Sequence, residues 1–277
     1  MKFAFITLDF RRFSLKTCFQ MAQRYGFDGI ELWGGRPHAY PMDLTPQCVE
    51  EIRAYKRDYG IQVPMYTPNV LGTHINLCAM ERQTQRDSVV FFQRAIQVAE
   101  NLEIPHVLLV ADHPGYYVSL ADARARFAEN VQNLGEFARP RGVGLTIEPL
   151  TPMESPVVIT ADDCLQIIQL VGLPNIHGML DVVPPTVVHE PLSNYFDKLG
   201  DRMSYIHLAN TDGKGDGHFA LDRGILSIPD LIRVFQERNY NGYVTMEFYS
   251  EGFYDPEVNL ANAVRILQQT GVYPLRP

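Results

Sequence analysis

Eight short β-rich runs, each followed by a longer polar or amphipathic segment, constrain this chain more than any other feature. Several runs are almost wholly apolar, such as VLLV at 107–110 and YVTMEF at 243–248. Parallel strands that helices cover on both faces have this character. The predicted strands are Phe3–Thr7, Gly29–Leu32, Gln62–Tyr66, His106–Val110, Gly144–Ile147, His177–Leu180, Ser204–Leu208 and Tyr243–Phe248.

Helices are predicted between these strands, and several carry residues that start a helix. Thr160 precedes Ala-Asp-Asp, a short form of the capping box, and Ser227-Ile-Pro-Asp combines a cap with proline in the first turn. Glycine follows other segments, as Gly26 and Gly60 do. The predicted helices are Ser14–Tyr25, Thr45–Tyr59, Glu81–Leu102, Leu120–Arg139, Thr160–Val171, Glu190–Leu199, Ser227–Arg238 and Pro256–Gln269.

This alternation predicts either a (β/α)₈ TIM barrel or a large open α/β sheet. No GxGxxG or GxxxxGK[ST] motif follows the first strand, so no nucleotide-binding open sheet is indicated. Acidic and histidine side chains, which can act in catalysis, gather at the C-terminal ends of the strands, where barrel active sites lie. No Gly/Ser-rich or Pro-rich linker divides the chain. We therefore predict an α/β protein whose residues 1–277 form a single (β/α)₈ barrel domain.

Charge and hydropathy exclude several partners. The net charge is −8 and no run of Lys or Arg occurs, so nucleic acid is not an expected partner. No apolar stretch approaches the ~18 residues of a membrane helix, and the apolar start of the chain is interrupted at Asp9. We expect a soluble cytoplasmic protein, monomeric or homo-oligomeric, with no membrane contact. Its four cysteines are far apart and are expected to be reduced thiols: Cys18, Cys48, Cys78 and Cys164.

The last four predicted strands each carry an acidic or imidazole side chain at or near the end: Glu148, Asp181, His207 and Glu247. One such residue is commonly a helix cap, a salt-bridge partner or a core histidine. Four at successive strand ends favour a metal site, because crowded carboxylates without a cation repel and raise one another's pKa. An oxygen-rich set with one nitrogen suits Mn²⁺, Mg²⁺, Co²⁺ or Ni²⁺. We predict one divalent ion on this quartet.

The same quartet carries a resemblance to a known family. Its order and its spacing, with 33 residues from Glu148 to Asp181 and 26 from Asp181 to His207, resemble the xylose-isomerase-like barrels and especially the ketose 3-epimerases of tagatose and psicose. The similarity extends over nearly the whole chain and is strongest to the fructoselysine 3-epimerase branch. It shows in GFDGIELWGGRPHAY (26–40), IEPLTPMES (147–155), EPLSNYFDKLGDRM (190–203) and IHLANTDG (206–213).

The resemblance implies an isomerase that inverts C3 of a sugar. In such epimerases the metal chelates the C2 carbonyl and C3 hydroxyl oxygens and stabilises the enediolate left when the C3 proton departs. Glu148 and Glu247 match the two glutamates that are both ligand and base, one removing the proton and the other returning it on the opposite face. Asp181 and His207 match the plain ligands.

Two positions depart from the free-ketose enzymes. Those enzymes carry a His three residues after the metal Asp and an Arg six residues after the metal His, where this chain has Pro184 and Gly213. Both residues normally bind substrate oxygens. Their absence fits the fructoselysine branch, whose substrate bears an amino acid on C1. The resemblance thus implies conversion of fructoselysine to psicoselysine.

Further residues near strand ends are candidates for substrate binding. Each also has a plain structural explanation, in the core, in loop packing or as an exposed side chain. Glu31, at the end of the second strand, is a candidate partner of His207 or a hydrogen-bonding group of the rim. The substrate-binding candidates are Trp33, Arg36, His38, Tyr66, His113, Glu154 and His218.

Four alternatives stay open at this stage. A free-ketose 3-epimerase and an aldose–ketose isomerase or cyclitol dehydratase begin with the same proton abstraction, so only the product separates them. An endonuclease-IV-like phosphodiesterase needs more metal-binding histidines and a basic surface, which the charge of −8 disfavours. A non-catalytic sugar-binding protein has no need of two bases, which Glu148 and Glu247 would provide.

Overall fold

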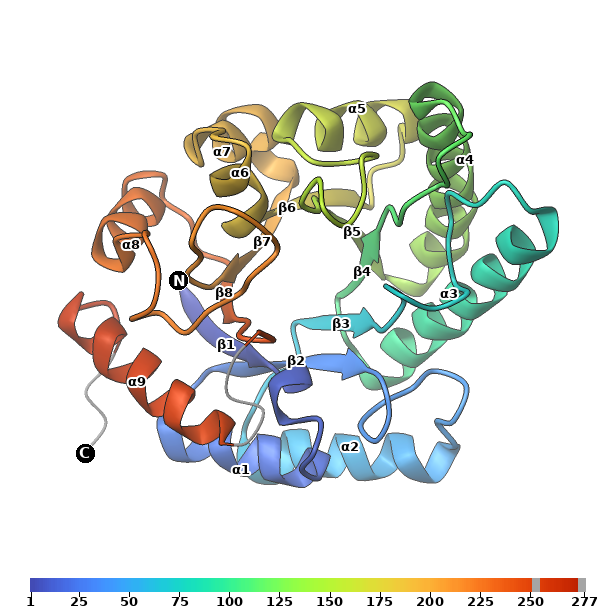
Figure 1. Cartoon of the computed structure of the whole chain (residues 1–277). Coiled ribbons are helices and arrows are strands. Elements are labelled where there is room, and N and C mark those ends of the chain that lie inside the picture. Colours follow the sequence, from blue (N-terminus) through green and yellow to red (C-terminus); the bar gives the residue numbers. More distant parts are fainter. Residues whose placement is uncertain (251–254, 274–277) are drawn as a thin grey trace.

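Eight parallel strands close into one barrel in the computed structural model, which describes residues 1–250 and 255–273 (Figure 1). Each strand pairs with the next, and β8 pairs with β1 to complete the ring. The predicted closed barrel is therefore confirmed. The strands are β1 Lys2–Ile6, β2 Gly29–Gly34, β3 Met65–Pro68, β4 His106–Val110, β5 Gly144–Glu148, β6 Ile176–Asp181, β7 Met203–Leu208 and β8 Tyr243–Met246.

The third strand lies further along the chain than the predicted Gln62–Tyr66. Pro64 has no N–H to donate to a neighbouring strand. Gln62 consequently makes only an isolated bridge to Gly29, and the ladder of β3 begins at Met65. The strand continues to Pro68 and places Thr67 beside Trp33 on β2. This shift brings the end of β3 level with the end of β2, where Pro68 pairs with Gly34.

Helices surround the strands, and α9 lies beside α1 so that the last unit closes onto the first (Figure 1). The predicted capping box of Thr160 with Asp163 is confirmed, and Ser14 caps the helix that follows it by accepting the N–H of Thr17. Among the described residues no helix is long and apolar enough to cross a membrane. The helices are α1 Leu15–Tyr25, α2 Pro46–Tyr59, α3 Arg82–Leu102, α4 Leu120–Ala138, α5 Ala161–Val171, α6 Val183–Val187, α7 Ser193–Leu199, α8 Ile228–Glu237 and α9 Pro256–Gln269, with 3₁₀ turns η1 Thr7–Phe10, η2 Arg139–Arg141 and η3 Gly200–Arg202.

Two helix predictions were wrong in detail. The predicted Glu190–Leu199 begins only at Ser193, and the unpredicted α6 precedes it. Glu190 instead reaches across to α5, where its carboxylate accepts the N–H of Ala161 at 3.2 Å. Ser227 stands before α8, but its side chain accepts no N–H of that helix. A tertiary contact accounts for the first case, and local sequence does not reveal it.

Two histidines pack together at the amino-terminal ends of β4 and β6, away from the strand ends predicted to bind metal. The rings of His106 and His177 lie 5.1 Å apart. Gly144 on β5 makes room for them, since a Cβ there would come within 2.9 Å of His106 Nδ1. Burial, together with the neighbouring His177, lowers the pKa of His106 to about 4.

This burial predicts acid sensitivity. Unfolded His106 takes up a proton near pH 6.5 and folded His106 only near pH 4, so the free energy of unfolding should fall across that interval, by up to about 3 kcal/mol. Urea unfolding at pH 7 and pH 4.5 should show a smaller loss in His106→Gln than in the wild type. The exposed His74 provides the control variant His74→Gln. Equal losses in wild type and His106→Gln would contradict the prediction.

Candidate active site

The four predicted metal ligands meet at the carboxyl ends of neighbouring strands. Glu148 ends β5 and Asp181 ends β6, while His207 is the last residue but one of β7 and pairs with Asp181. Glu247 follows β8 directly, and its N–H donates to the carbonyl of Leu208 on β7 at 3.2 Å. Barrel closure therefore places side chains separated by up to a hundred residues in one cluster.

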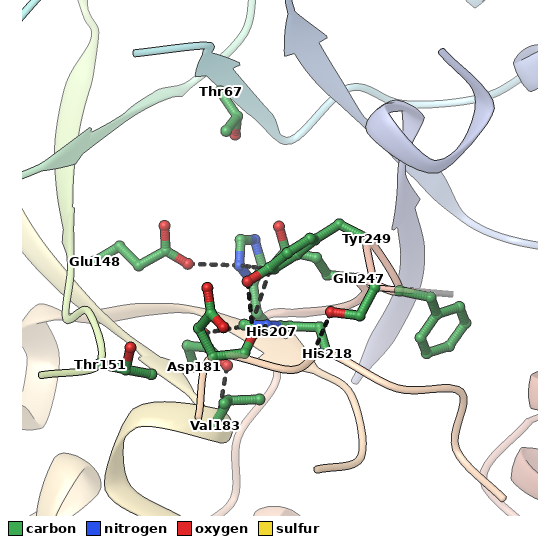
Figure 2. Close-up of polar contacts among 12 residues, drawn as sticks. Thr67, Glu148, Thr151, Asp181, Val183, His207, His218, Glu247 and Tyr249 are labelled. Carbon is green, nitrogen blue, oxygen red and sulfur yellow. Dashed lines mark hydrogen bonds and ion pairs between the residues drawn. The ribbon is translucent and has the colours of Figure 1, made fainter. Parts of the chain in front are cut away.

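His207 lies at the centre of this cluster. Its Nδ1 is 2.7 Å from Glu148 Oε1 and 2.9 Å from Glu247 Oε2, and the two carboxylates reach it from different sides (Figure 2). Its Nε2 faces Glu31 Oε2 at 2.9 Å, which confirms the predicted contact with Glu31. A carboxylate can only accept, so Nε2 carries a proton toward Glu31, and Nδ1 is the ring nitrogen left to face the two glutamates.

The surroundings of Nδ1 make the cluster fit a cation. Nδ1 is buried and has no hydrogen-bond partner, because its short contacts with the glutamates lack hydrogen-bond geometry. The ligand atoms of Glu148, His207 and Glu247 all lie within 4.8 Å of one another, as do those of Asp181, His218 and Glu247. A buried imidazole nitrogen beside several carboxylate oxygens is the donor set of a divalent-metal site.

The pKa values of these groups reflect the same crowding. Burial raises the pKa of Glu148, and nearby Glu247 and Asp181 add to that effect while His207 opposes it. Burial acts in the same direction on Glu247, but His207 and His218 outweigh it and lower its pKa. Burial alone would lower the pKa of His207, yet the carboxylates of Glu31, Glu247 and Glu148 raise it well above its usual value. The histidines therefore supply the positive charge that the carboxylates need.

His218 joins the cluster from the long loop between β7 and α8. Its Nε2 lies 2.9 Å from Asp181 Oδ2, and its Nδ1 donates to the carbonyl of Asp216 at 2.7 Å. The backbone N–H of His218 bonds Ser250 Oγ at 2.9 Å, and the Tyr249 ring packs 4.7 Å from its own. These contacts fasten the loop to the segment after β8 and hold the imidazole over Asp181 (Figure 2).

A cavity of about 390 Å³ opens above the cluster. Its floor includes Glu148, Asp181 and Glu247, so a small ligand inside it would meet the predicted metal ligands directly. His207 lies beneath this surface, fully buried. The lining combines polar and apolar side chains, as suits a sugar. The other lining residues are Leu8, Asn69, Leu71, Gly72, Asp112, Leu150, Glu154, Asp216, His218 and Tyr249.

Only two of the seven predicted substrate-binding residues, Glu154 and His218, line this cavity. Glu154 is held by Thr151, whose N–H and hydroxyl both donate to Oε2 at 2.9 Å. His113 points back into its own turn, where Nδ1 accepts the N–H of Gly115 at 3.0 Å. Its neighbour Asp112, which was not predicted, faces the cavity instead.

The other predicted binding residues take part in contacts outside the cavity lining. The Trp33 ring covers Gly35, where a Cβ would lie 2.1 Å from it. Arg36 forms an exposed ion pair with Asp43, and Tyr66 is buried with its hydroxyl donating to the carbonyl of Ala39. His38 is buried with Nε2 at 3.0 Å from the carbonyl of Phe13. Each side chain therefore has a local partner already.

Some cavity-lining residues were not predicted from the sequence, although they lie just after strand ends. Tyr249 lies two residues after Glu247, and Asp112 two residues after the end of β4, so both follow strand ends. Asn69 lies one residue after β3, which was predicted too early. The position after a strand was thus informative, but the direction of each side chain depends on how the loop turns.

The contact between Glu31 and His207 yields a prediction about metal affinity. Glu31→Gln should weaken divalent-metal binding about 10- to 100-fold, because the carboxylate fixes the tautomer that frees Nδ1. Titration with Mn²⁺ followed by calorimetry would measure the change. Glu129→Gln, on the exposed face of α4, is the matched control. An unchanged affinity in Glu31→Gln would contradict this role.

Comparisons with known proteins agree with this geometry. The family model described as "Xylose isomerase-like TIM barrel" matches residues 19–270. A fructoselysine 3-epimerase of Shigella flexneri is 34% identical over 264 residues, covering 95% of this chain and 96% of that protein. Among solved structures, a D-psicose 3-epimerase with D-tagatose from Clostridium cellulolyticum H10 matches with a TM-score of 0.83 at 16% identity, covering 99% of each chain. The IOLI protein with a bound zinc atom matches with a TM-score of 0.83 at 15% identity, covering both chains completely.

The two solved structures are similar in fold, whereas the family model and the Shigella flexneri relative are similar in sequence over almost the whole chain. The matched stretch includes every residue of the metal-ligand quartet and Glu31. Together these findings establish that the chain belongs to the xylose isomerase-like TIM barrel family.

Proposed function

We propose that the protein is a divalent-metal-dependent 3-epimerase of a ketose or ketosamine, with fructoselysine as the preferred substrate and psicoselysine as its product. One observation carries the proposal: Glu148 and Glu247 flank His207 Nδ1 from two sides, at the floor of a cavity of sugar size. Inversion at a carbon needs two bases on opposite faces, and binding alone does not.

Glu148, Asp181, His207 and Glu247 would hold the metal. When bound, a divalent ion polarises the C2 carbonyl and lowers the cost of negative charge on the adjacent oxygens. One oxygen of Glu148 and one of Glu247 are directed at Nδ1, so the second oxygen of each carboxylate is available to move a proton. One glutamate takes the C3 proton, and the other delivers a proton to the opposite face of the planar intermediate.

The relatives support the choice of reaction and substrate. The Shigella flexneri relative is named a fructoselysine 3-epimerase, and a D-psicose 3-epimerase of Agrobacterium fabrum is 25% identical over 231 residues, 81% of this chain. Both names specify inversion at C3. Pro184 and Gly213 stand where the free-ketose enzymes have substrate-binding His and Arg, which supports the ketosamine. An aldose–ketose isomerase is the second candidate, since a 2-oxo-tetronate isomerase of Haemophilus influenzae is 23% identical over 258 residues.

A substrate panel in D₂O tests the proposal. Protein supplied with Mn²⁺, Co²⁺, Ni²⁺ or Mg²⁺ should incorporate deuterium at C3 of fructoselysine and form psicoselysine, as followed by NMR. Turnover of psicose or tagatose without turnover of fructoselysine would move the substrate to the free ketoses. Formation of an aldose would indicate the isomerase, and absence of exchange in every sugar would refute the proposal.

A further inference from the structure

The cavity above the quartet is strongly acidic. Six carboxylates line it: Asp112, Glu148, Glu154, Asp181, Asp216 and Glu247. No lysine or arginine belongs to the lining among the described residues, and His218 is already bonded to Asp181 and to the Asp216 carbonyl. One divalent ion and one imidazolium cannot balance this charge. The cavity therefore favours a ligand that brings positive charge and disfavours a sugar phosphate.

The three carboxylates outside the quartet differ in how far they are already engaged. Glu154 Oε2 accepts both hydrogen bonds from Thr151, and Asp216 is exposed to solvent. Asp112 is half-buried, and its Oδ1 accepts the N–H of His113 at 2.6 Å. Within the described part of the chain no cationic side chain forms an ion pair with Asp112. Its carboxylate is partly desolvated and keeps one oxygen uncommitted, and burial raises its pKa accordingly. Glu154 is also half-buried and its Oε1 lies outside the Thr151 bonds, but it stands six residues beyond β5, whereas Asp112 stands two residues beyond β4.

Asp112 also lies close enough to the metal-ligand quartet to reach the C1 substituent of a bound ketosamine. Val110, the last residue of β4, pairs with Glu148 at the end of β5. Asp112 follows two residues later, so its backbone lies within about 7 Å of that strand end. A ketosamine bound through its C2 and C3 oxygens carries its nitrogen on C1, next to C2. That nitrogen would therefore lie close above the quartet, at the level of Asp112.

We infer that Asp112 binds the protonated nitrogen of a ketosamine and thereby selects ketosamines over neutral ketoses. The inference rests on the proposed function, because it assigns one group of the proposed substrate to one residue of the same cavity. A charge-assisted hydrogen bond to a partly buried carboxylate changes affinity by about 10- to 100-fold. Asp112 is on this account a specificity-determining residue and takes no part in proton transfer.

The substitution Asp112→Asn tests this assignment. Asparagine keeps an oxygen for the His113 N–H and loses the charge. The ratio of kcat/KM for fructoselysine to kcat/KM for psicose, measured with the same metal ion, should fall about 10- to 100-fold, chiefly through KM for fructoselysine. Asp112→Glu restores the charge and should recover part of the ratio. Asp58→Asn, an exposed position on α2, should leave the ratio unchanged.

A neutral analogue gives a second readout. Fructoselysine acylated on the sugar-bearing nitrogen lacks the positive charge, so wild type should prefer the parent compound and Asp112→Asn should show little preference between them. A ratio within twofold of wild type in a folded, metal-loaded Asp112→Asn protein would overturn the assignment and leave the proposed function standing. Failure of the wild type to turn over fructoselysine at all would overturn both.

Discussion

Replacing either Glu148 or Glu247 with glutamine is expected to lower epimerisation by about 10²- to 10⁴-fold. Glutamine keeps an oxygen that can contact the metal but cannot accept the C3 proton. Because inversion uses one base on each face, the loss of either base should stop the full reaction. Steady-state rates with saturating metal, together with the metal content of each variant, measure the effect. Glu129→Gln, exposed on α4, is the control and should retain the wild-type rate.

Deuterium exchange would then assign each glutamate to a face. In D₂O, a variant that lacks the base acting on fructoselysine should exchange no C3 hydrogen from that epimer, yet still exchange it from psicoselysine. The variant of the other glutamate should show the reverse pattern. The distances of Glu148 and Glu247 from Nδ1 are nearly equal, so geometry leaves the two roles symmetric. A folded, metal-loaded variant of either glutamate with near-normal inversion would refute the two-base scheme.

Removal of divalent ions by chelation is expected to abolish epimerisation while the barrel stays folded. The core of the barrel consists of apolar side chains between strands and helices, and the metal-ligand quartet contributes none of it. His207 and His218, whose pKa values are raised by the adjacent carboxylates, supply positive charge when no ion is bound. The free energy of unfolding should therefore fall only by the binding contribution, about 3–4 kcal/mol at 100 to 1,000 times Kd.

Two measurements separate loss of activity from loss of fold. Far-UV circular dichroism should be unchanged after chelation at 25 °C, and the melting temperature should fall by about 10 °C. Activity should return when Mn²⁺, Co²⁺, Ni²⁺ or Mg²⁺ is added back singly, and the order of recovery would identify the preferred ion. Loss of the helical signal on chelation, or full activity in protein shown by elemental analysis to contain no metal, would contradict this expectation.

The strands and the quartet could be predicted because both depend on local pattern plus chain order. Apolar runs locate the strands, and successive parallel strands of a barrel must bring their carboxyl ends together. Glu148, Asp181, His207 and Glu247 therefore had to meet once the barrel was assumed. The error at β3 has the same origin, since the apolar pattern around Ile61 and Val63 outweighed the missing N–H of Pro64.

The cavity wall could not be predicted in the same way. In the segment after β4 the sequence favoured His113, but its ring bonds Gly115 and the preceding Asp112 lines the cavity. Trp33 and Arg36 looked equally suitable as sugar contacts, yet the first covers Gly35 and the second pairs with Asp43. The direction of a loop side chain depends on turn hydrogen bonds and distant partners, which residue type and spacing do not encode.

The quartet comes from β5, β6, β7 and the residue after β8. Other lining residues come from the first half of the chain, namely Leu8, Asn69, Leu71, Gly72 and Asp112. Glu31, beneath His207, also comes from the first half. On the proposed function, the two glutamates that move protons would come from the second half, and these first-half residues would contact the sugar from the other side. Laboratory evolution confined to the loops after β1, β3 and β4 should accordingly redirect the enzyme to new sugars without rebuilding its catalytic half.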